Sequence, residues 1–299
     1  MKPWVRALKQ RTFGAGKFSQ SYQDELLEII FSHVGTGNSP PFCVEFGFSS
    51  HRLTGGTGAN VARLIVEQQW RSRLFDRDHE NPEINLHRER LDAGNIGTIF
   101  RRHGVPPQPD YVSIDVDSTD LWLFEALLRE FPARVFSVEY NSHFPLEAAI
   151  TFPNDPAERW ENDRGYGASL KALNLVARKH GYSLLWVVPR LDAFFIRNDL
   201  IDDGSDQICF PFAQWRNCTG LTFHPPLRDS ARAGIFLDYE ILGKPGGNIA
   251  AARLGARARC RRYLGWKYPT LYDLAKGLVP AGIKRMVRRM TAKWVSGGN

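Results

Sequence analysis

The chain has 299 residues, of which 43% are hydrophobic and 24% are charged, and its mean hydropathy is −0.34. These values exclude collagen, coiled-coil and intrinsically disordered proteins. No segment reaches the roughly 18 to 20 apolar residues of a membrane span, and none has the apolar core of a signal peptide. We therefore expect a cytoplasmic globular protein, with peripheral membrane attachment and organelle targeting left open. The four cysteines have no metal-binding spacing, which predicts reduced thiols.

Positive charge is concentrated near the C-terminus. Twelve Lys or Arg follow Ala251 against a single acid, Asp273, whereas the whole chain has a net charge of only +7. The body is therefore mildly acidic, which argues against a basic nucleic-acid-binding domain. This change of charge predicts three parts: an N-terminal helical segment (1–41), a main domain (42–242) and a basic C-terminal extension (243–299).

Hydrophobic patterns predict alternating strands and helices along the main domain. Apolar runs predict strands, in chain order, at 42–46, 73–75, 87–91, 110–117, 134–140, 182–188 and 193–196. Helical spacing predicts helices at 23–33, 59–70, 96–100, 121–131 and 169–180. This alternation predicts an α/β fold with a doubly wound, mostly parallel sheet, whose last two strands form an antiparallel pair.

Polar residues follow several of these predicted strands. In an open parallel sheet, ligands bind beyond the carboxyl ends of the strands, so these residues are the candidates for a site. They are Glu45, Gly47, Asp76, Asp78, Asp115, Asp117, Glu139, Asn141 and His143. A single Asp after a strand is more often a helix cap or a turn former, but repeated acids at four strand ends indicate a binding site.

The first predicted strand is followed by a glycine-containing loop. A glycine there lets a cofactor approach the backbone, and an acid after the second strand can bind ribose hydroxyls. Gly47 and Asp76 have these positions. The loop departs from the compact Gly-x-Gly pattern, because bulky residues follow Gly47 and the next glycines come only at 55–58.

The residues at the strand ends resemble those of class I S-adenosylmethionine-dependent methyltransferases, and within them the FkbM-like branch. The similarity lies in Val-Glu-Phe-Gly at 44–47, Phe-Asp-Arg-Asp at 75–78, Ser-Ile-Asp-Val-Asp at 113–117 and Val-Glu-Tyr-Asn at 138–141. It covers residues 42–200, which would make 42–242 a Rossmann-like methyltransferase domain.

This resemblance implies roles for individual residues. Glu45 and Gly47 would border the methionine part of the cofactor, and Asp76 or Asp78 would bind its ribose. Asp115, counted among the cofactor-binding residues, would face the reaction centre together with the catalytic candidates Asp117 and Glu139.

His143 is the candidate general base that removes a proton from the methyl acceptor. The alternative is that it is an ordinary loop histidine beside Phe144 and Pro145. Asp117, Glu139 and Asn141 offer oxygen ligands suited to Mg²⁺, which would lower the pKa of an acceptor hydroxyl. The alternative for Asp117 is that it caps the following helix.

Two further segments are candidates for binding. The long polar and aromatic segment 151–167 follows a strand end, and its Arg159, Trp160, Arg164 and Tyr166 suit either a substrate lid or a packed Ω-loop. Residues 270–295 have a basic amphipathic pattern. That pattern suits an anionic membrane surface or a helix docked on the body, and nucleic acid is a less favoured partner.

The sequence thus predicts a methyltransferase that uses S-adenosylmethionine, with Mg²⁺ as a candidate second cofactor. Its acceptor would be an oxygen of a small molecule, a sugar, or a glycan or lipid headgroup. The alternative is a catalytically inactive protein of the same fold that binds a membrane or a protein partner through its basic tail.

Overall fold

The computed structural model describes residues 1–48, 50–55, 59–229 and 231–265. The basic segment 270–295 and most of the delayed glycine cluster therefore lie outside the described residues. The strands are β1 (Phe42–Phe46), β2 (Arg71–Asp76), β3 (Leu86–Arg88), β4 (Tyr111–Ile114), β5 (Val135–Glu139), β6 (Ile150–Thr151), β7 (Tyr182–Val187), β8 (Asp192–Arg197) and β9 (Leu237–Asp238). The α-helices are α1 (Pro3–Leu8), α2 (Gln23–Val34), α3 (Ala62–Val66), α4 (Ile96–Arg102), α5 (Asp120–Glu130), α6 (Leu170–Lys179), α7 (Asn198–Ile201), α8 (Tyr239–Leu242) and α9 (Ile249–Leu264). Three 3₁₀ helices lie at Pro82–Ile84, Phe212–Cys218 and Ala231–Gly234.

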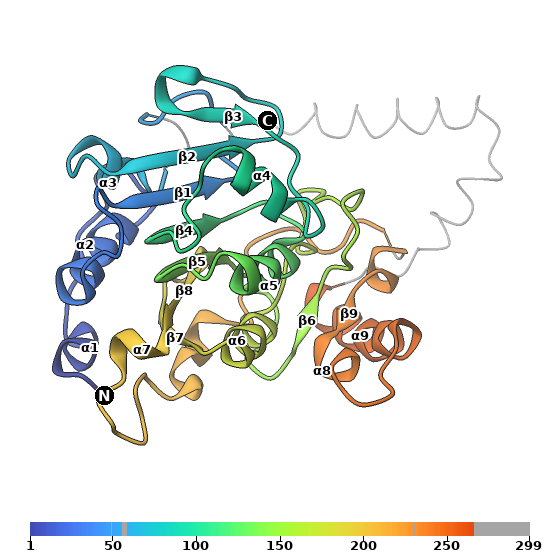
Figure 1. Cartoon of the computed structure of the whole chain (residues 1–299). Coiled ribbons are helices and arrows are strands. Elements are labelled where there is room, and N and C mark those ends of the chain that lie inside the picture. The colour runs from blue at the N-terminus through green and yellow to red at the C-terminus, as the bar shows by residue number, and fades with distance from the viewer. Residues whose placement is uncertain (49, 56–58, 230, 266–299) are drawn as a thin grey trace, which may run out of the picture. The chain divides into compact units, whose positions relative to one another are not determined.

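Seven strands form one sheet in the order β3-β2-β1-β4-β5-β8-β7. The first five in this order are parallel, and β8 runs antiparallel to both β5 and β7. The structure therefore confirms the predicted α/β fold. It is the mixed sheet of the class I methyltransferase fold, with the strand order reversing between β1 and β4 (Figure 1).

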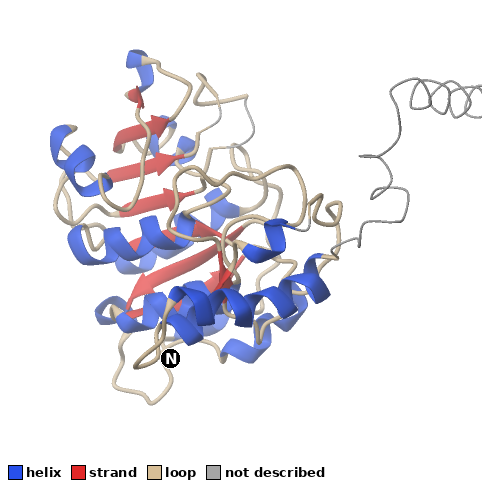
Figure 2. Cartoon of the chain, turned by 90° about the vertical axis from the view of Figure 1, so that its right-hand side faces the viewer, coloured by secondary structure: helices blue, strands red, loops and turns tan. Residues whose placement is uncertain are grey.

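Helices cover both faces of the sheet (Figure 2). Because side chains alternate along a strand, β1 contributes to two hydrophobic cores. Phe42, Val44 and Phe46 pack in the core formed with α4, α5 and α6, whereas Cys43 packs in the core formed with α1, α2 and α3. Both faces are dry, which explains why the central strands are continuous apolar runs rather than alternating ones.

Helix α6 shows how the local sequence sets an element's limits. The Ser169 side chain accepts a hydrogen bond from the Ala172 backbone N–H and so caps the helix start. Gly181, with φ of +78°, follows the helix end, where a left-handed residue is favoured. The apolar stripe between them is buried in the core.

The predicted helix at 59–70 is much shorter in the structure, where α3 spans only Ala62–Val66. The backbone N–H groups of Asn60 and Val61 donate to the carboxylate of Glu45 instead. A residue from the end of β1 therefore fixes where this helix begins, which helical spacing alone does not reveal.

A second sheet of two strands is separate from the main sheet. The short strands β6 and β9 pair antiparallel, and α8 and α9 pack beside β9 (Figure 1). Helix α9 buries Ala256, Cys260 and Leu264 in a third hydrophobic cluster. The described part of the basic extension is thus a packed helix, and residues 1–266 form one compact unit. No helix among the described residues is long and apolar enough to cross a membrane.

Candidate functional site

A cavity of about 370 Å³ opens at the carboxyl ends of the parallel strands. Five of the predicted site residues line it, from β1, β2 and β4 or the segments that follow them: Gly47, Asp76, Asp78, Asp115 and Asp117. Residues far apart in the sequence meet here because parallel strands all end at the same edge of the sheet. Glu45, Glu139, Asn141 and His143 are not among the lining residues.

Gly47 lies where the chain leaves β1 and passes close to β4. Its φ is +80°, and a Cβ at this position would lie 1.3 Å from the carbonyl oxygen of Asp115. No side chain fits in that space, so only glycine allows the ends of β1 and β4 to meet at the cavity. Gly47 therefore shapes the cavity whether or not a cofactor approaches it.

Glu45 lies beneath the cavity rather than in its wall. Its carboxylate accepts hydrogen bonds of 3.1 Å from the N–H groups of both Asn60 and Val61. Burial raises the pKa of Glu45 to about 7, although these two bonds favour the charged form. Glu45 thus holds the loop after β1 against the start of α3.

The two acids after β2 have different surroundings. The Asp76 side chain is buried, and its Oδ1 accepts from the backbone N–H groups of Asp78 and His79 at 2.7 and 2.8 Å. The Nδ1 of His79 lies 2.8 Å from the same oxygen. Asp78 is exposed and pairs with Arg77 at 2.6 Å. Asp76 therefore orders the turn, and Asp78 extends from it at the cavity wall.

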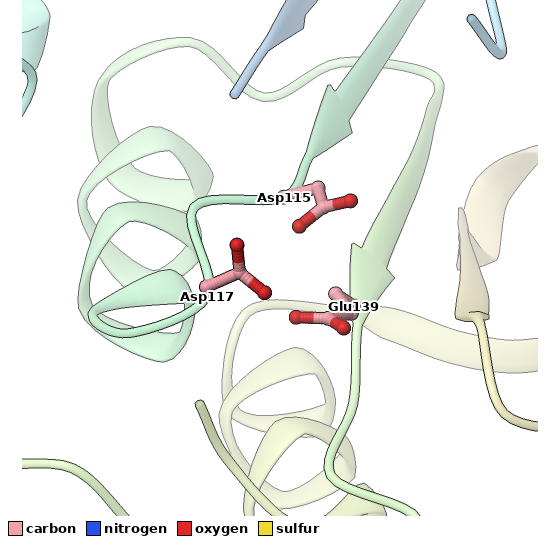
Figure 3. A group of neighbouring side chains, drawn as sticks. All are labelled: Asp115, Asp117 and Glu139. Atoms are coloured by element: carbon pink, nitrogen blue, oxygen red, sulfur yellow. The ribbon is translucent and has the colours of Figure 1, made fainter. Parts of the chain in front are cut away.

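Asp115, Asp117 and Glu139 bring their carboxylates together, with one oxygen of each within 4.8 Å of the others. Figure 3 shows the three side chains pointing toward one another from the end of β5 and from the segment after β4. Among the residues that the structure describes, no hydrogen bond or ion pair holds any of these three carboxylates. The Oε2 atom of Glu139 is buried without a hydrogen-bond partner.

This acidic cluster is electrostatically unfavourable when every member is charged. Burial raises the pKa of Asp115 and of Glu139 well above their usual range, and repulsion between the carboxylates raises them further. Burial also raises the pKa of Asp117. Such a cluster favours bound protons or a bound cation, because either one removes the repulsion.

Asp117 does not cap the helix that follows it. The N–H groups of Val116 and Ser118 donate to the Asp120 carboxylate at 2.7 and 2.9 Å, so Asp120 closes this turn. Asp117 itself adopts the left-handed conformation, with φ of +58°. Its side chain lines the cavity.

His143 is buried among aromatic side chains. Its Nδ1 lies 2.5 Å from the carbonyl oxygen of Leu221, and its ring contacts Tyr166 and Phe223. Burial lowers its pKa to about 4, so the ring is neutral at physiological pH. This position is that of a packed histidine, and it does not bring His143 to the cavity.

Asn141 holds neighbouring backbone in place. Its Nδ2 donates to the carbonyl oxygens of Arg164 and Tyr166 at 2.9 and 2.8 Å, and its Oδ1 accepts from the His143 N–H at 3.0 Å. These bonds engage both ends of the amide. In the described structure, Glu139 therefore meets Asp115 and Asp117, and Asn141 anchors the segment that covers the sheet end.

The segment 151–167 contributes one wall of the cavity through Pro156, Glu158, Arg159 and Trp160. A buried ion pair of 3.3 Å between Asp163 and Arg232 anchors it. Arg164 donates to the His224 carbonyl oxygen, and Tyr166 is buried beside His143, so neither of these two is among the lining residues. The segment is thus a packed loop whose tip reaches the cavity.

Two groups of site residues are absent from the sequence-based prediction. His79, Glu89 and Arg90 line the cavity from the segments after β2 and β3. Glu89 and Arg90 follow β3 directly because this strand ends at Arg88, whereas the predicted strand at 87–91 contained them, so the rule for strand ends did not select them. Asp192 lies opposite Glu139 in the β5–β8 pair and accepts from Asn60 at 2.8 Å. Its place beside the acidic cluster depends on strand pairing and has no local signal.

No protein-family model matches this chain, and no curated protein matches it.

Proposed function

We propose that this protein is an S-adenosylmethionine-dependent methyltransferase. It would transfer the methyl group to an oxygen of a small molecule, a sugar, or a glycan or lipid headgroup. The observation that carries this proposal is the cavity at the carboxyl ends of β1, β2 and β4, where a glycine and several acids line the wall in a fold of the class I methyltransferase type. The resemblance to the FkbM-like branch supports it.

In this proposal, the cofactor lies across the ends of β1 and β2. The absence of a side chain at Gly47 leaves the backbone accessible to the methionine part, and Asp76 or Asp78 binds the ribose hydroxyls. Asp115 lies next to the methyl donor. Glu45 acts as a positioning residue, because its carboxylate holds the backbone of Asn60 and Val61 beneath the cavity.

When no cation is bound, Asp117 is the proposed base, since it lines the cavity and its raised pKa makes it a better proton acceptor than an ordinary Asp. S-adenosylmethionine would supply the methyl group: the acceptor oxygen would form the new bond to the methyl carbon, and the electron pair of the broken carbon–sulfur bond would stay on sulfur. The hydroxyl proton passes to the Asp117 carboxylate. The enzyme's main contribution is alignment of donor and acceptor.

The acidic cluster fits a divalent cation such as Mg²⁺. Three carboxylates that face one another offer the oxygen ligands that this ion prefers. The Oε2 of Glu139, which is buried without a hydrogen-bond partner, is available as a metal ligand. Asp115, Asp117 and Glu139 would hold the ion, which would lower the pKa of an acceptor hydroxyl. Asn141, assigned to the same site from the sequence, has its amide engaged elsewhere.

Calorimetric titration with S-adenosylhomocysteine, with and without Mg²⁺, tests the donor site without knowledge of the acceptor. We expect micromolar binding by the wild type. Asp76→Asn and Asp78→Ala identify the residue that binds the ribose. Substitution of that residue should weaken the affinity for S-adenosylhomocysteine by about 10- to 100-fold. Asp206→Ala removes an exposed acid outside the cavity and serves as the control.

Two outcomes would contradict this proposal. If S-adenosylhomocysteine binds neither with Mg²⁺ nor without it, the alternative is favoured, in which an inactive protein of this fold acts through its basic tail. Equal affinity in both variants and in their double mutant would remove the ribose assignment, even if the wild type binds. Direct Mg²⁺ titration of Glu139→Gln tests the metal separately, since unchanged affinity would exclude the acidic cluster as its site.

A further inference from the structure

We propose that the exposed face of α9 binds the surface of an anionic lipid bilayer. This inference is independent of the methyltransferase activity, because α9 contributes no residue to the cavity. It also concerns residues other than the segment 270–295, in which the sequence predicted membrane contact. The argument depends on which face of α9 is packed, what the other face exposes, and the charge that surrounds it.

One side of α9 packs against the rest of the protein. Ala252, Ala256, Cys260 and Leu264 recur every four residues and are buried, the last three within the third hydrophobic cluster. Gly255 allows this close packing, because a Cβ there would lie 2.4 Å from the Cδ1 of Ile241. The orientation of the helix is therefore fixed, and its other side faces away from the protein.

The outer side exposes apolar groups. Leu254 is 73% exposed, the largest exposed fraction among the exposed large hydrophobic residues of the described structure, whereas Ile249, which is 56% exposed, lies three residues before Ala252 and projects from the packed side at the start of the helix. Ala258 lies four residues after Leu254, so the two share one exposed strip of the helix. Exposed leucine and isoleucine gain free energy when they enter an apolar environment.

Arginines surround this strip, and α9 contains no acid. Arg253 and Arg257 are exposed and have no ion-pair partner within the described part of the chain, and Arg262 is exposed beside Tyr263. Arg259 pairs with Asp238 at 3.1 Å. A basic helical face with exposed leucine is typical of helices that lie in the membrane interface.

Charge also argues for an external anionic partner. The 34 residues after α9 and Gly265 contain seven Lys or Arg and a single acid, so their charge has the same sign as that of the helix. A nucleic acid would satisfy the arginines but would leave Leu254 unused, whereas a bilayer satisfies both the arginines and Leu254.

Co-sedimentation of the full chain with vesicles tests this proposal. Vesicles of phosphatidylcholine with a quarter phosphatidylserine should pellet the protein at low salt, and vesicles of phosphatidylcholine alone should not. Combining Arg253→Gln, Arg257→Gln and Arg262→Gln should weaken partitioning by about 100-fold. The matched control combines Arg6→Gln, Lys9→Gln and Arg178→Gln, which removes the same charge from exposed positions on or just after α1 and in α6.

A second pair of variants tests the apolar contribution. Leu254→Ser should weaken partitioning by about tenfold, whereas Val66→Ser, at a side chain that is 51% exposed in α3, should leave it unchanged. Circular dichroism would verify that each variant is folded. Equal losses in the two triple variants, or no effect of Leu254→Ser, would overturn the proposal. So would binding to a single-stranded oligonucleotide without binding to the anionic vesicles.

Discussion

Asp76 and Glu139 each end a buried strand of the same sheet, but their carboxylates are stabilised differently. Asp76 accepts two backbone N–H bonds and a contact from His79, so its charge is compensated by the turn that it orders. Glu139 meets two other carboxylates and has an orphaned oxygen. Asp76 thus orders the turn at the β2 end of the cavity, whereas the acids at the β4–β5 end repel one another when they are charged.

Substitution at the junction of these two regions should have the largest effect. Gly47→Ala places a methyl group against the carbonyl of Asp115, and we expect the free energy of unfolding to fall by more than about 4 kcal/mol, measured by urea denaturation. Gly104→Ala is the control, because Gly104 also has a positive φ but has nothing within 4 Å of its Cβ position. Gly104→Ala should lower the free energy of unfolding by only about 1 to 2 kcal/mol. Similar losses in both would mean that the contact with β4 is unimportant.

The pH dependence of stability tests the buried acids as a group. Burial raises the pKa of Glu45 to about 7 and of Asp192 to about 6. A folded-state pKa above the unfolded value gives a contribution that is complete near pH 4 and is lost as the pH rises through 6 to 7. We expect each group to remove about 3 kcal/mol between pH 4 and pH 8. Asp192→Asn should reduce this slope in urea denaturation, and an unchanged slope would contradict the assignment.

Substitutions of the two acids after β2 should differ in their effect on the free energy of unfolding. Asp76→Ala leaves two backbone N–H groups without their acceptor, and we expect a loss of about 2 kcal/mol in the free energy of unfolding. Asp78→Ala removes an exposed, solvent-screened ion pair and should leave the free energy of unfolding nearly unchanged. Thermal and urea denaturation of both variants would measure this difference. If Asp78→Ala cost as much as Asp76→Ala, the turn would not depend on Asp76.

Substitution of Glu139, at the end of β5, should change the free energy of unfolding in the opposite direction. Glu139→Gln removes one charge from the acidic cluster, and we expect the free energy of unfolding to rise by about 1 kcal/mol at pH 8 in the absence of divalent cations. Glu83→Gln, at an exposed acid outside the cluster, should have no such effect. Added Mg²⁺ should stabilise the wild type and not Glu139→Gln. A destabilised Glu139→Gln would show that this carboxylate has a structural partner.

Much of the fold follows from local patterns. The apolar run at 42–46 coincides with β1, the predicted helices at 23–33, 121–131 and 169–180 agree with α2, α5 and α6 to within a residue or two, and the final antiparallel pair is confirmed. These elements were predictable because a parallel sheet covered on both faces requires continuous apolar strands and amphipathic helices. The rule that sites lie after such strands then selected Gly47, Asp76, Asp78, Asp115 and Asp117, which all line the cavity.

Other features were decided by the tertiary structure. Whether an acid after a strand is compensated depends on which backbone groups and strands come near it, so sequence alone did not distinguish Asp76 from Glu139. Burial and the contact with Leu221 separate His143 from the cavity, although a histidine in this position suits a base. By itself the sequence determined the α/β fold and the edge where its acids gather, because both follow from periodicity. Only tertiary packing determined which of those acids have partners, because partners come from segments distant in the chain.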